Sequence, residues 1–298
     1  MTKASTLNRR LRWFDEGAAA LKRTFPDAPR GIYVCPLCLG TFERDAVAAN
    51  KLTDEHVPPF AIERRRPRLL SCRECNNASS SRHDAHLVKA NLMNTWGSPG
   101  TAGPLPDSVM RVNGVVLRGE MSDDGTNRTF KVIPKQNNPN DFLRLVESLI
   151  EMGNGSVNGV DFSAVARHDQ EAAAMSIVRA AYLAAFVTFG YKYILRDVLD
   201  PYRSMIANDD RSIIPLMRSQ SVPVTARMVW PFIEAPPALR GAVGVVVGRD
   251  IVVLPGHDRV VDVLKAIAAM TPLGEQQSMV VGLHYARWPD EPLYLDDV

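Results

Sequence analysis

Two Cys-x-x-Cys pairs constrain this chain more than any other feature of its sequence. Cys35 and Cys38 form the first pair, Cys72 and Cys75 form the second, and the chain has no other cysteine. Each pair can place two thiolates on one side of a tight turn, so two pairs provide the tetrahedral sulfur site that zinc prefers. The 33 intervening residues exceed the spacing of common zinc ribbons and predict an inserted structure. A redox Cys-x-x-Cys motif and disulfides are the alternatives.

A zinc ion held by four cysteines has no open coordination position, so it would stabilise the fold and take no part in chemistry. The first ten residues contain no apolar stretch of the kind that a signal peptide needs. Residues 172–189 are the most apolar stretch, but Arg179 interrupts them, which is typical of a buried helix rather than a membrane span. We therefore expect a cytoplasmic protein without membrane contact, in which cysteines stay reduced.

Polar residues of catalytic type lie between and after the cysteine pairs. Glu55 and His56 belong to the segment LTDEHVPP (residues 52–59), and Asn76 directly follows Cys75 in CRECNNASSSRHDAHL (residues 72–87). The order of CPLC, DEHVPP and LLSCRECNNASSSRHDAHL resembles the nucleases of the His-Asn-His (HNH) type, which have a zinc-bound ββα-metal fold. The resemblance covers residues 31–90, under a third of the chain, and rests on several rare elements in the same order.

The resemblance implies a β-hairpin that carries the catalytic histidine and a short helix that carries the asparagine. His56 would be the general base, because an imidazole with a near-neutral pKa can deprotonate water. Glu55 and Asn76 would hold Mg²⁺ or Mn²⁺, which carboxylate and amide oxygens suit as ligands. Family members often have Asp before the histidine, and Glu55 is one methylene longer. Neighbours 55 and 56 face opposite sides of a strand unless the backbone bends.

A second histidine follows the asparagine on the predicted helix. If this helix begins near Asn76, His83 lies seven residues further on, almost two turns, and shares the same face. We therefore expect His83 in the active site, Asp84 as a further ligand of the divalent ion, and His86 in a structural role. The alternative for Asn76 is that it only caps the helix.

Arginines surround the motif, and the N-terminal part of the chain is basic. Residues 1–90 carry 16 Lys and Arg against 10 Asp and Glu, whereas the remainder carries 19 against 23. A basic region of this kind suits a polyanion, and arginine pairs with phosphate through a bidentate fork. The alternative for any single arginine is a solvated loop. The predicted nucleic-acid-binding residues are Arg64, Arg65, Arg66, Arg68, Arg73 and Arg82.

The predicted fold class is α+β, with an N-terminal ββα-metal (HNH) module around a structural zinc and a mixed α+β domain with a long central helix. Gly- and Pro-rich residues 96–106 suggest a linker, which divides the chain into domains 1–95 and 107–298. The hydrophobic patterns predict helices at 6–25, 141–152, 169–199 and 260–270. They predict strands at 109–117, 129–133, 222–229, 243–247, 251–254 and 279–285.

These features together predict a metal-dependent HNH endonuclease that hydrolyses phosphodiester bonds. DNA is expected as the substrate rather than RNA, because most of the family cuts DNA, and a role in phage defence would suit the family. One alternative is a catalytically inactive, zinc-stabilised nucleic-acid-binding module, and another is an RNA-cleaving toxin or defence effector. The C-terminal domain carries no motif, and it could recognise substrate, bind a protein partner or form a homo-oligomer.

Overall fold

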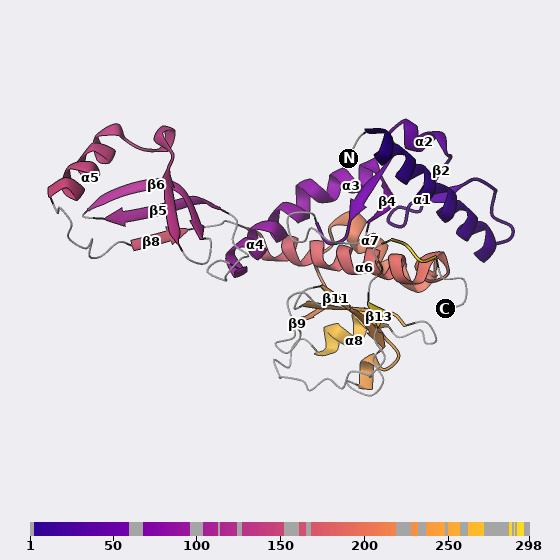
Figure 1. Cartoon of the computed structure of the whole chain (residues 1–298). Coiled ribbons are helices and arrows are strands. Elements are labelled where there is room, and N and C mark those ends of the chain that lie inside the picture. Colours follow the sequence, from indigo (N-terminus) through magenta and orange to yellow (C-terminus); the bar gives the residue numbers. More distant parts are fainter. Residues whose placement is uncertain are drawn as a thin grey trace. The chain divides into compact units, whose positions relative to one another are not determined.

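The chain divides into two compact units, one formed by residues 1–85 together with 171–298 and the other by residues 86–170. The fold is known from a computed structural model (Figure 1). It describes residues 3–59, 68–95, 104–112, 114–123, 127–151, 161–164, 168–218, 228–231, 237–247, 250–256, 262–270, 286–287, 289 and 291–294. The predicted α+β class with a long central helix is confirmed, and the cysteines lie in its N-terminal part.

The larger unit begins with helix α1 (Lys3–Thr24), which buries one apolar stripe that includes Trp13, Phe14 and Leu21. Two short antiparallel strands follow, β1 (Tyr33–Val34) and β2 (Thr41–Phe42), and then helix α2 (Asp45–Ala48). The spacing of the apolar residues along α1 follows the helical period, so a single face packs against the strands below it. The other face of α1 remains in solvent.

A β-hairpin and a helix come next in the larger unit. Strands β3 (Leu52–His56) and β4 (Arg68–Cys72) pair antiparallel, with Leu52 opposite Cys72 and His56 opposite Arg68. Helix α3 (Arg73–Ser79) starts directly after β4 and continues into a π-helical turn, η1 (Ser80–Asp84). The second cysteine pair therefore lies where the hairpin ends and the helix begins.

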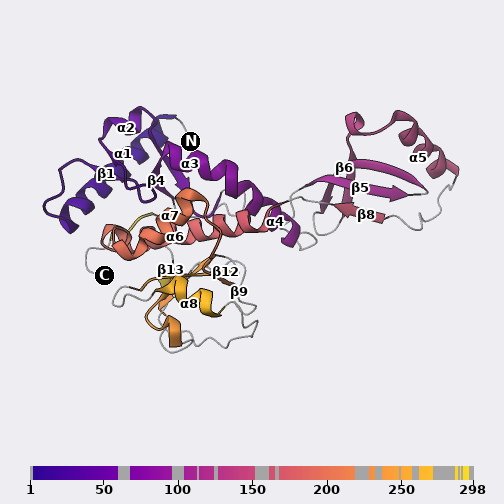
Figure 2. The same ribbon diagram turned by 180° about the vertical axis from the view of Figure 1, so that it is seen from behind.

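Helix α6 (Gln170–Ile194) is the central element of the larger unit and lies between the N-terminal segments and the C-terminal sheet (Figures 1 and 2). It is apolar on all sides, as expected for a helix inside a core. By length and composition it could cross a membrane, but 89% of its most apolar 18-residue stretch is buried within the protein. Burial of this kind is typical of the core helix of a soluble protein.

Three tyrosines show how α6 joins distant parts of the chain. The Tyr191 hydroxyl donates to the carbonyl of Val34 at 3.0 Å, and Tyr182 donates to the carbonyl of Pro36 at 3.1 Å. The Tyr193 hydroxyl, also in the last turn, donates instead to the carbonyl of Pro255 at 2.7 Å. Gly190 bends the helix there with φ 70°, a conformation that favours glycine.

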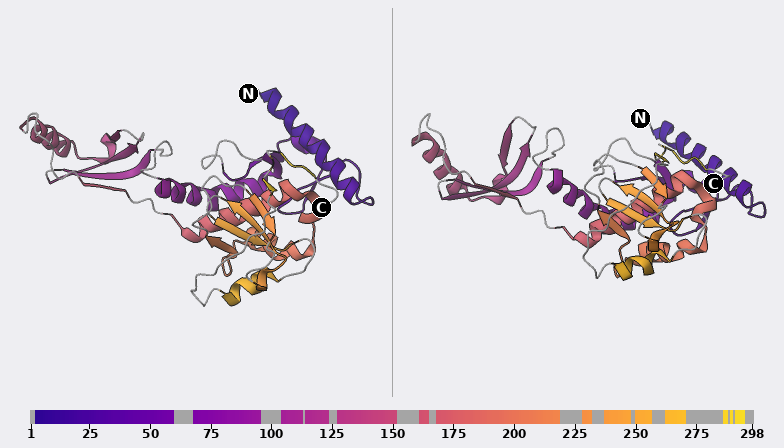
Figure 3. Two further views of the ribbon diagram at one scale, coloured as in Figure 1. Left: turned by 60° about the horizontal axis from the view of Figure 1, so that its bottom comes forward. Right: turned by 90° about the horizontal axis from the view of Figure 1, so that it is seen from below.

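The C-terminal part of the larger unit contains a five-stranded sheet with the order β13-β10-β11-β12-β9. Strands of this sheet are seen in orange in Figure 3. Every residue of β11 and β12 is buried, so both faces of the sheet are covered, with α6 on one side and α8 on the other (Figures 1 and 2). Its elements are η3 (Asp197–Leu199), α7 (Asp200–Asn208), β9 (Leu216–Arg218), β10 (Met228–Pro231), η4 (Pro237–Leu239), β11 (Val243–Val247), β12 (Asp250–Leu254), α8 (Val263–Met270) and β13 (Ala286–Arg287).

The smaller unit contains a four-stranded antiparallel sheet with the order β7-β6-β5-β8. Its small core contains Val112, Leu117 and Leu145, the last from helix α5. The elements are α4 (Ala85–Thr95), β5 (Leu105–Val112), β6 (Val115–Asp123), β7 (Arg128–Val132), η2 (Pro134–Gln136), α5 (Pro139–Glu151) and β8 (Asp161–Ala164).

The two units differ from the predicted division into residues 1–95 and 107–298. Residues 171–298 pack with residues 1–85, and the stretch from 86 to 170 is an insertion between them. The reason is that the N-terminal segments bury their inner surface against α6, which follows more than a hundred residues later. A change in composition marks only where the chain leaves a unit and cannot show where it returns.

Most predicted elements are found near their expected positions. The strand predicted at 109–117 is wrong as a single strand, because β5 and β6 meet there in a tight connection at Gly114, which has φ 77°. The long helix predicted at 169–199 is α6, which ends at Ile194 and is followed by η3 and α7. The strand predicted at 279–285 and most of the one at 222–229 lie outside the described residues.

Candidate functional site

The four cysteines converge on one point in the larger unit. Their sulfur atoms all lie within 4.8 Å of one another, and the Sγ atoms of Cys38 and Cys72 are 3.7 Å apart. Four sulfur donors at this spacing fit a tetrahedral metal ion, and the set is consistent with a structural zinc. Among the described residues, no other group of three or more His, Cys, Asp and Glu side chains is arranged to hold a metal.

The backbone around the cysteines favours thiolates. The amide of Cys75 donates to Sγ of Cys72 at 3.4 Å, and the amide of Cys72 donates to Sγ of Cys35 at the same distance. Because zinc binds the deprotonated sulfur, the turns around both pairs are suited to a metal. The sulfur geometry argues against separate disulfides within each pair.

Asn76, the residue after the second cysteine pair, ties helix α3 to the hairpin. Its Nδ2 donates to Oγ1 of Thr53 at 3.1 Å and to the carbonyl of Asp54 at 2.9 Å. Asn76 is not a helix cap, because α3 begins three residues earlier at Arg73; its side chain instead fixes the position of strand β3 just before His56. The cysteine cluster, the hairpin and the helix form one rigid arrangement through these bonds.

Alternation along β3 separates Glu55 from His56. The strand is regular from Leu52 to His56, so Asp54 and His56 share one face and Glu55 occupies the other. His56 is half-buried at the end of the strand, directly opposite Arg68 of β4. On the same face, the Asp54 carboxylate accepts hydrogen bonds from Arg9 at 2.5 Å and from Arg10 at 2.5 Å, both from α1. The backbone bend that would bring positions 55 and 56 together is absent between Leu52 and His56.

Glu55 is buried in an ion pair with Arg179 of α6. The Nη2 atom of Arg179 lies 2.7 Å from Oε2 of Glu55, and the hydroxyl of Ser71 donates to the same oxygen at 3.1 Å. The two charged side chains are only 3% and 4% exposed. Burial alone would lower the pKa of Arg179, but its attraction to Glu55 and Asp84 outweighs burial and raises the pKa. The guanidinium therefore stays charged.

Asp84 lies on the other side of the same guanidinium. Its Oδ2 atom is 4.0 Å from Nη1 of Arg179, and its Oδ1 accepts a hydrogen bond from Ser176 at 2.6 Å. Its side chain is 16% exposed, so it is the more accessible of the two carboxylates. Glu55 and Asp84, which the sequence predicts as metal ligands, thus converge on an arginine.

His83 lies in the π-helical turn and faces Asp209 at the end of α7. Its Nε2 is 2.8 Å from Oδ1 of Asp209, and the imidazole is 4% exposed. A hydrogen bond from Arg211 is the main cause that lowers the pKa of Asp209 to about 2, and His83 adds to it. The wider π-helical turn interrupts the helical period, so the argument that seven residues place His83 on the face of Asn76 does not apply. The proposed catalytic role of His83 loses that support.

The predicted nucleic-acid-binding arginines lie in several places. Arg68 is half-buried beside His56, whereas Arg73 and Arg82 are exposed on α3 and the π-helical turn. Arg64, Arg65 and Arg66 lie outside the described residues. His86 accepts a hydrogen bond from the amide of Asp169 at 2.8 Å within the smaller unit. This contact agrees with a structural role for His86.

The residues predicted to hold Mg²⁺ or Mn²⁺ do not fit such an ion in this arrangement. The Glu55 carboxylate is compensated by Arg179, which also lies 4.0 Å from Asp84. The Nδ2 of Asn76 is used to hold β3. A divalent ion needs several accessible oxygen ligands that converge on one point. We therefore assign no chemical step to such an ion from this geometry.

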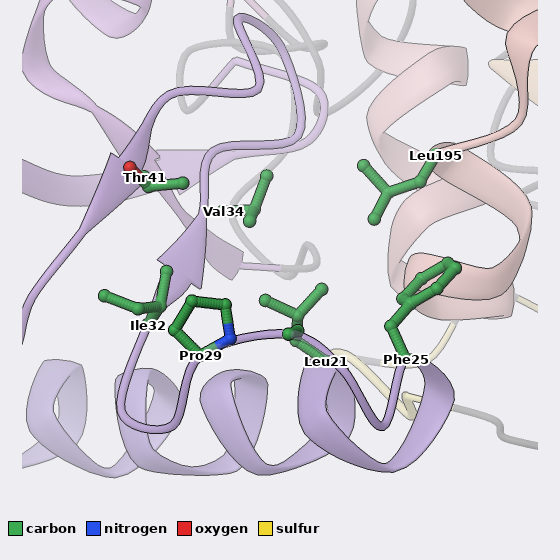
Figure 4. A pocket seen from close by; sticks show the side chains of 8 residues that line it. Leu21, Phe25, Pro29, Ile32, Val34, Thr41 and Leu195 are labelled. Carbon is green, nitrogen blue, oxygen red and sulfur yellow. The ribbon is translucent and has the colours of Figure 1, made fainter.

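A pocket of the larger unit lies among α1, the strands β1 and β2 and the residue that follows α6 (Figure 4). It has a volume of about 370 Å³, and its lining is almost wholly apolar. None of the predicted site residues lines it, so it does not suit a phosphodiester. The lining residues are Leu21, Phe25, Ala28, Pro29, Ile32, Val34, Thr41 and Leu195.

Sequence reasoning missed the residues that come from distant elements. In the sequence, Arg179 only interrupts an apolar stretch. An arginine inside such a stretch nevertheless predicts an anionic partner, because a buried guanidinium needs one. Asp209, Arg9 and Arg10 gave no signal of their own. Comparison of this chain with family models, with curated proteins and with solved structures finds no match.

Proposed function

We propose that this protein is a nuclease of the HNH type, which hydrolyses phosphodiester bonds, with DNA as the expected substrate. The observation that supports this most is the tether from Asn76 to β3, since it links the cysteine cluster to the strand that ends in His56. A hairpin followed by a helix, held by four cysteines and carrying these side chains, is the arrangement that the sequence resemblance implies.

His56 is the proposed general base. It is half-buried at the end of β3. An imidazole near neutral pKa can take the proton of water as the water attacks phosphorus. Arg68, its partner across the hairpin, is placed to offset negative charge on the phosphate oxygens.

The proposed role of the cysteine-bound zinc is structural. It fixes the start of α3 and the end of β4, and through Asn76 it fixes the strand that carries His56. The resemblance further implies Mg²⁺ or Mn²⁺ at Glu55 and Asn76, with Asp84 as an additional ligand. In the observed arrangement Arg179 engages Glu55 and the amide of Asn76 holds β3, so no step of the proposed mechanism is assigned to such an ion.

The ion pair of Glu55 favours a second candidate function. A nucleic-acid-binding module that has lost catalysis would keep the cysteines and arginines, and its acidic residue could become part of the core. Glu55 is 3% exposed and paired with Arg179, as this candidate requires. The pairing of Glu55 with Arg179 is also compatible with a nuclease in which Glu55 does not bind a metal ion.

The experiment that tests the proposal uses the zinc-loaded protein with Mg²⁺ or Mn²⁺ on plasmid DNA and on RNA. We expect nicking or cutting of DNA by the wild type and a loss of about a hundredfold or more in His56→Ala, the effect of removing a general base. His86→Ala is the matched control and should cut normally. Cleavage that survives His56→Ala would remove this residue from the mechanism. Binding without any cutting would favour the second candidate, and cutting of RNA alone would correct the substrate.

A further inference from the structure

Helix α5 of the smaller unit has an apolar face that extends beyond the part packed on the sheet. Leu145 belongs to the core and is 6% exposed. Phe142, Leu143 and Ile150 lie further round the helix and are 45%, 56% and 73% exposed. Because residues four apart share a helix face, Phe142, Val146 and Ile150 form a stripe along the helix. Single apolar side chains on a surface are normal, but a contiguous apolar surface marks an interaction site.

The edge strand β8 adds an aromatic ring to this apolar surface. Phe162 of β8 is 43% exposed and lies opposite Met110, which itself lies opposite Leu117 of the core. Directly opposite residues of an antiparallel sheet share a face, so Phe162 is on the side of the sheet on which α5 packs. Its ring centroid is 6.0 Å from that of Phe130. The apolar surface therefore includes one helix and one edge of the sheet.

The charges on α5 do not suit a nucleic acid or a membrane as the partner of this surface. Asp141 and Glu147 are acidic, and Arg144 lies 3.9 Å from Asp141. Residues 86–170 as a whole carry 8 Lys and Arg against 9 Asp and Glu. Nucleic-acid backbones and anionic lipid surfaces are bound through an excess of basic side chains, which residues 86–170 lack. A nearly neutral, apolar surface suits a protein surface of the same character.

The spacing along the stripe is self-complementary. Phe142 and Ile150 lie four residues before and four residues after Val146, which is half-buried. If two copies of α5 pack antiparallel about a two-fold axis at Val146, Phe142 of each copy contacts Ile150 of the other. The antiparallel arrangement also places the ends of the two helix dipoles beside ends of opposite sign.

The size of the surface is sufficient for a weak dimer. Phe142, Leu143, Ile150 and Phe162 together expose on the order of 400 Å² per copy, since a large apolar side chain has a surface of about 150–250 Å² and these are roughly half exposed. Two copies would bury about 800 Å² from these side chains alone. With the atoms around them, the total approaches the lower limit of about 1,200 Å² for specific interfaces.

We propose that the apolar surface formed by α5 and Phe162 pairs with the same surface of a second copy of this chain. The dimer is weak and reversible, with a dissociation constant in the micromolar range, because the buried area is small. This inference does not rest on the proposed function, since no residue of the hairpin or of the cysteine cluster takes part. The nuclease and the dimer can therefore fail separately.

The test is sedimentation velocity of the full-length, zinc-loaded protein from micromolar to submillimolar concentrations. We expect the wild type to change from monomer to dimer over this range. Ile150→Glu places a charge in the apolar contact and should weaken dimerisation by about tenfold or more. The side chain of Ile150 is 73% exposed, so the variant should fold normally. Circular dichroism and zinc content report folding.

Val116→Glu is the matched control. Val116 belongs to the same sheet and is 46% exposed, but its neighbours Val115 and Leu117 are buried, so it lies on the opposite face. The same change of charge there should leave the dissociation constant within about twofold of the wild type.

The antiparallel register is tested by cross-linking with a short thiol-specific reagent, with zinc protecting the native cysteines. A mixture of Phe142→Cys and Ile150→Cys should give more covalent dimer than either variant alone. Stronger cross-linking of each variant to itself would indicate parallel helices and contradict the two-fold axis at Val146.

Two results in sedimentation would overturn the proposal. One is a wild type that stays monomeric at every concentration, and the other is a dimer that Ile150→Glu does not weaken. A monomeric wild type together with a lower melting temperature of Ile150→Glu would also overturn it, because the surface would then be covered within one chain.

Discussion

The two compact units use contacts of very different range. In the larger unit, Tyr191 and Val34 are bonded across 157 residues, and Arg179 and Glu55 across 124. In the smaller unit, β5, β6 and β7 follow one another in the chain and in the sheet, and Asn137 bonds to Arg118 only 19 residues away. Its longer-range contacts are the return of β8 to β5, with Asp161 opposite Arg111, and the bond between His86 and Asp169. Local pairing requires little loop closure, whereas the larger unit needs both ends of the chain before its core can form.

This comparison explains where the side chains of proposed functional importance are. The cysteine cluster, the hairpin and Arg179 all belong to the larger unit, in which buried polar groups meet across distant segments. Each buried charge there has a specific partner, so the side chains are held in defined positions. The described part of the smaller unit has a small apolar core and mostly exposed polar contacts.

The largest expected effect comes from breaking the cysteine cluster. Cys72→Ser, or removal of zinc by a chelator, should unfold the hairpin and α3 and lower the melting temperature by more than 10 °C, because a structural zinc contributes directly to folding. Hydrogen exchange measured by mass spectrometry should show loss of protection in residues 68–79 and little change in residues 105–132. Full zinc content with an unchanged melting temperature would contradict the assignment.

The next effect comes from the buried ion pair. Arg179→Met should lower the free energy of unfolding of the larger unit by about 3–5 kcal/mol, because Glu55 would remain buried without a partner. Arg179→Met/Glu55→Gln should be less destabilised than the single variant, since the uncompensated charge is gone. Urea denaturation of Arg179→Met, Glu55→Gln and the double variant gives the coupling free energy between the two side chains. A coupling near zero would show that the pair does not hold α6 to the hairpin.

A smaller effect is expected from one hydroxyl on α6. Tyr191→Phe keeps the aromatic packing but leaves the buried carbonyl and amide of Val34 without the hydroxyl, which bonds to both. We expect a loss of about 1–3 kcal/mol in the larger unit, the range for an unsatisfied buried group. Thermal denaturation measures it, with Tyr193→Phe as a control on the same helix that affects the C-terminal sheet instead. Hydrogen exchange locates the effect. An equal loss of exchange protection at β1 and β2 in both variants would contradict the assignment of Tyr191 to the N-terminal strands and of Tyr193 to the C-terminal sheet.

The smallest effect belongs to the smaller unit. Asn137→Ala removes bonds to both the amide and the carbonyl of Arg118, but these groups are accessible to water. We expect a loss of about 1 kcal/mol or less, with faster exchange confined to the neighbouring strands. Exchange in residues 171–194 should not change. If it does, the two units are more strongly coupled than their separate cores suggest.

The features that could be predicted from the sequence are those with a local cause. The sulfur site follows from the spacing within each cysteine pair, and the hairpin between β11 and β12 follows from two apolar runs separated by a short polar segment. The partner of Glu55 could not be predicted, because no sequence pattern relates positions 55 and 179. The π-helical turn at residues 80–84 also could not be predicted, so the helical spacing from Asn76 to His83 does not apply and the role of His83 stays a prediction.

The insertion of residues 86–170 separates the synthesis of the hairpin that carries Glu55 from the synthesis of its partner Arg179. Arg179 follows Cys75 by 104 residues, so at about 5–20 residues per second the ribosome needs roughly 5–20 s to add it after the last cysteine. During that interval the nascent hairpin carries Glu55 without its arginine, and the inserted sheet can fold on its own local contacts. Glu55 therefore has no arginine partner until α6 has been synthesised.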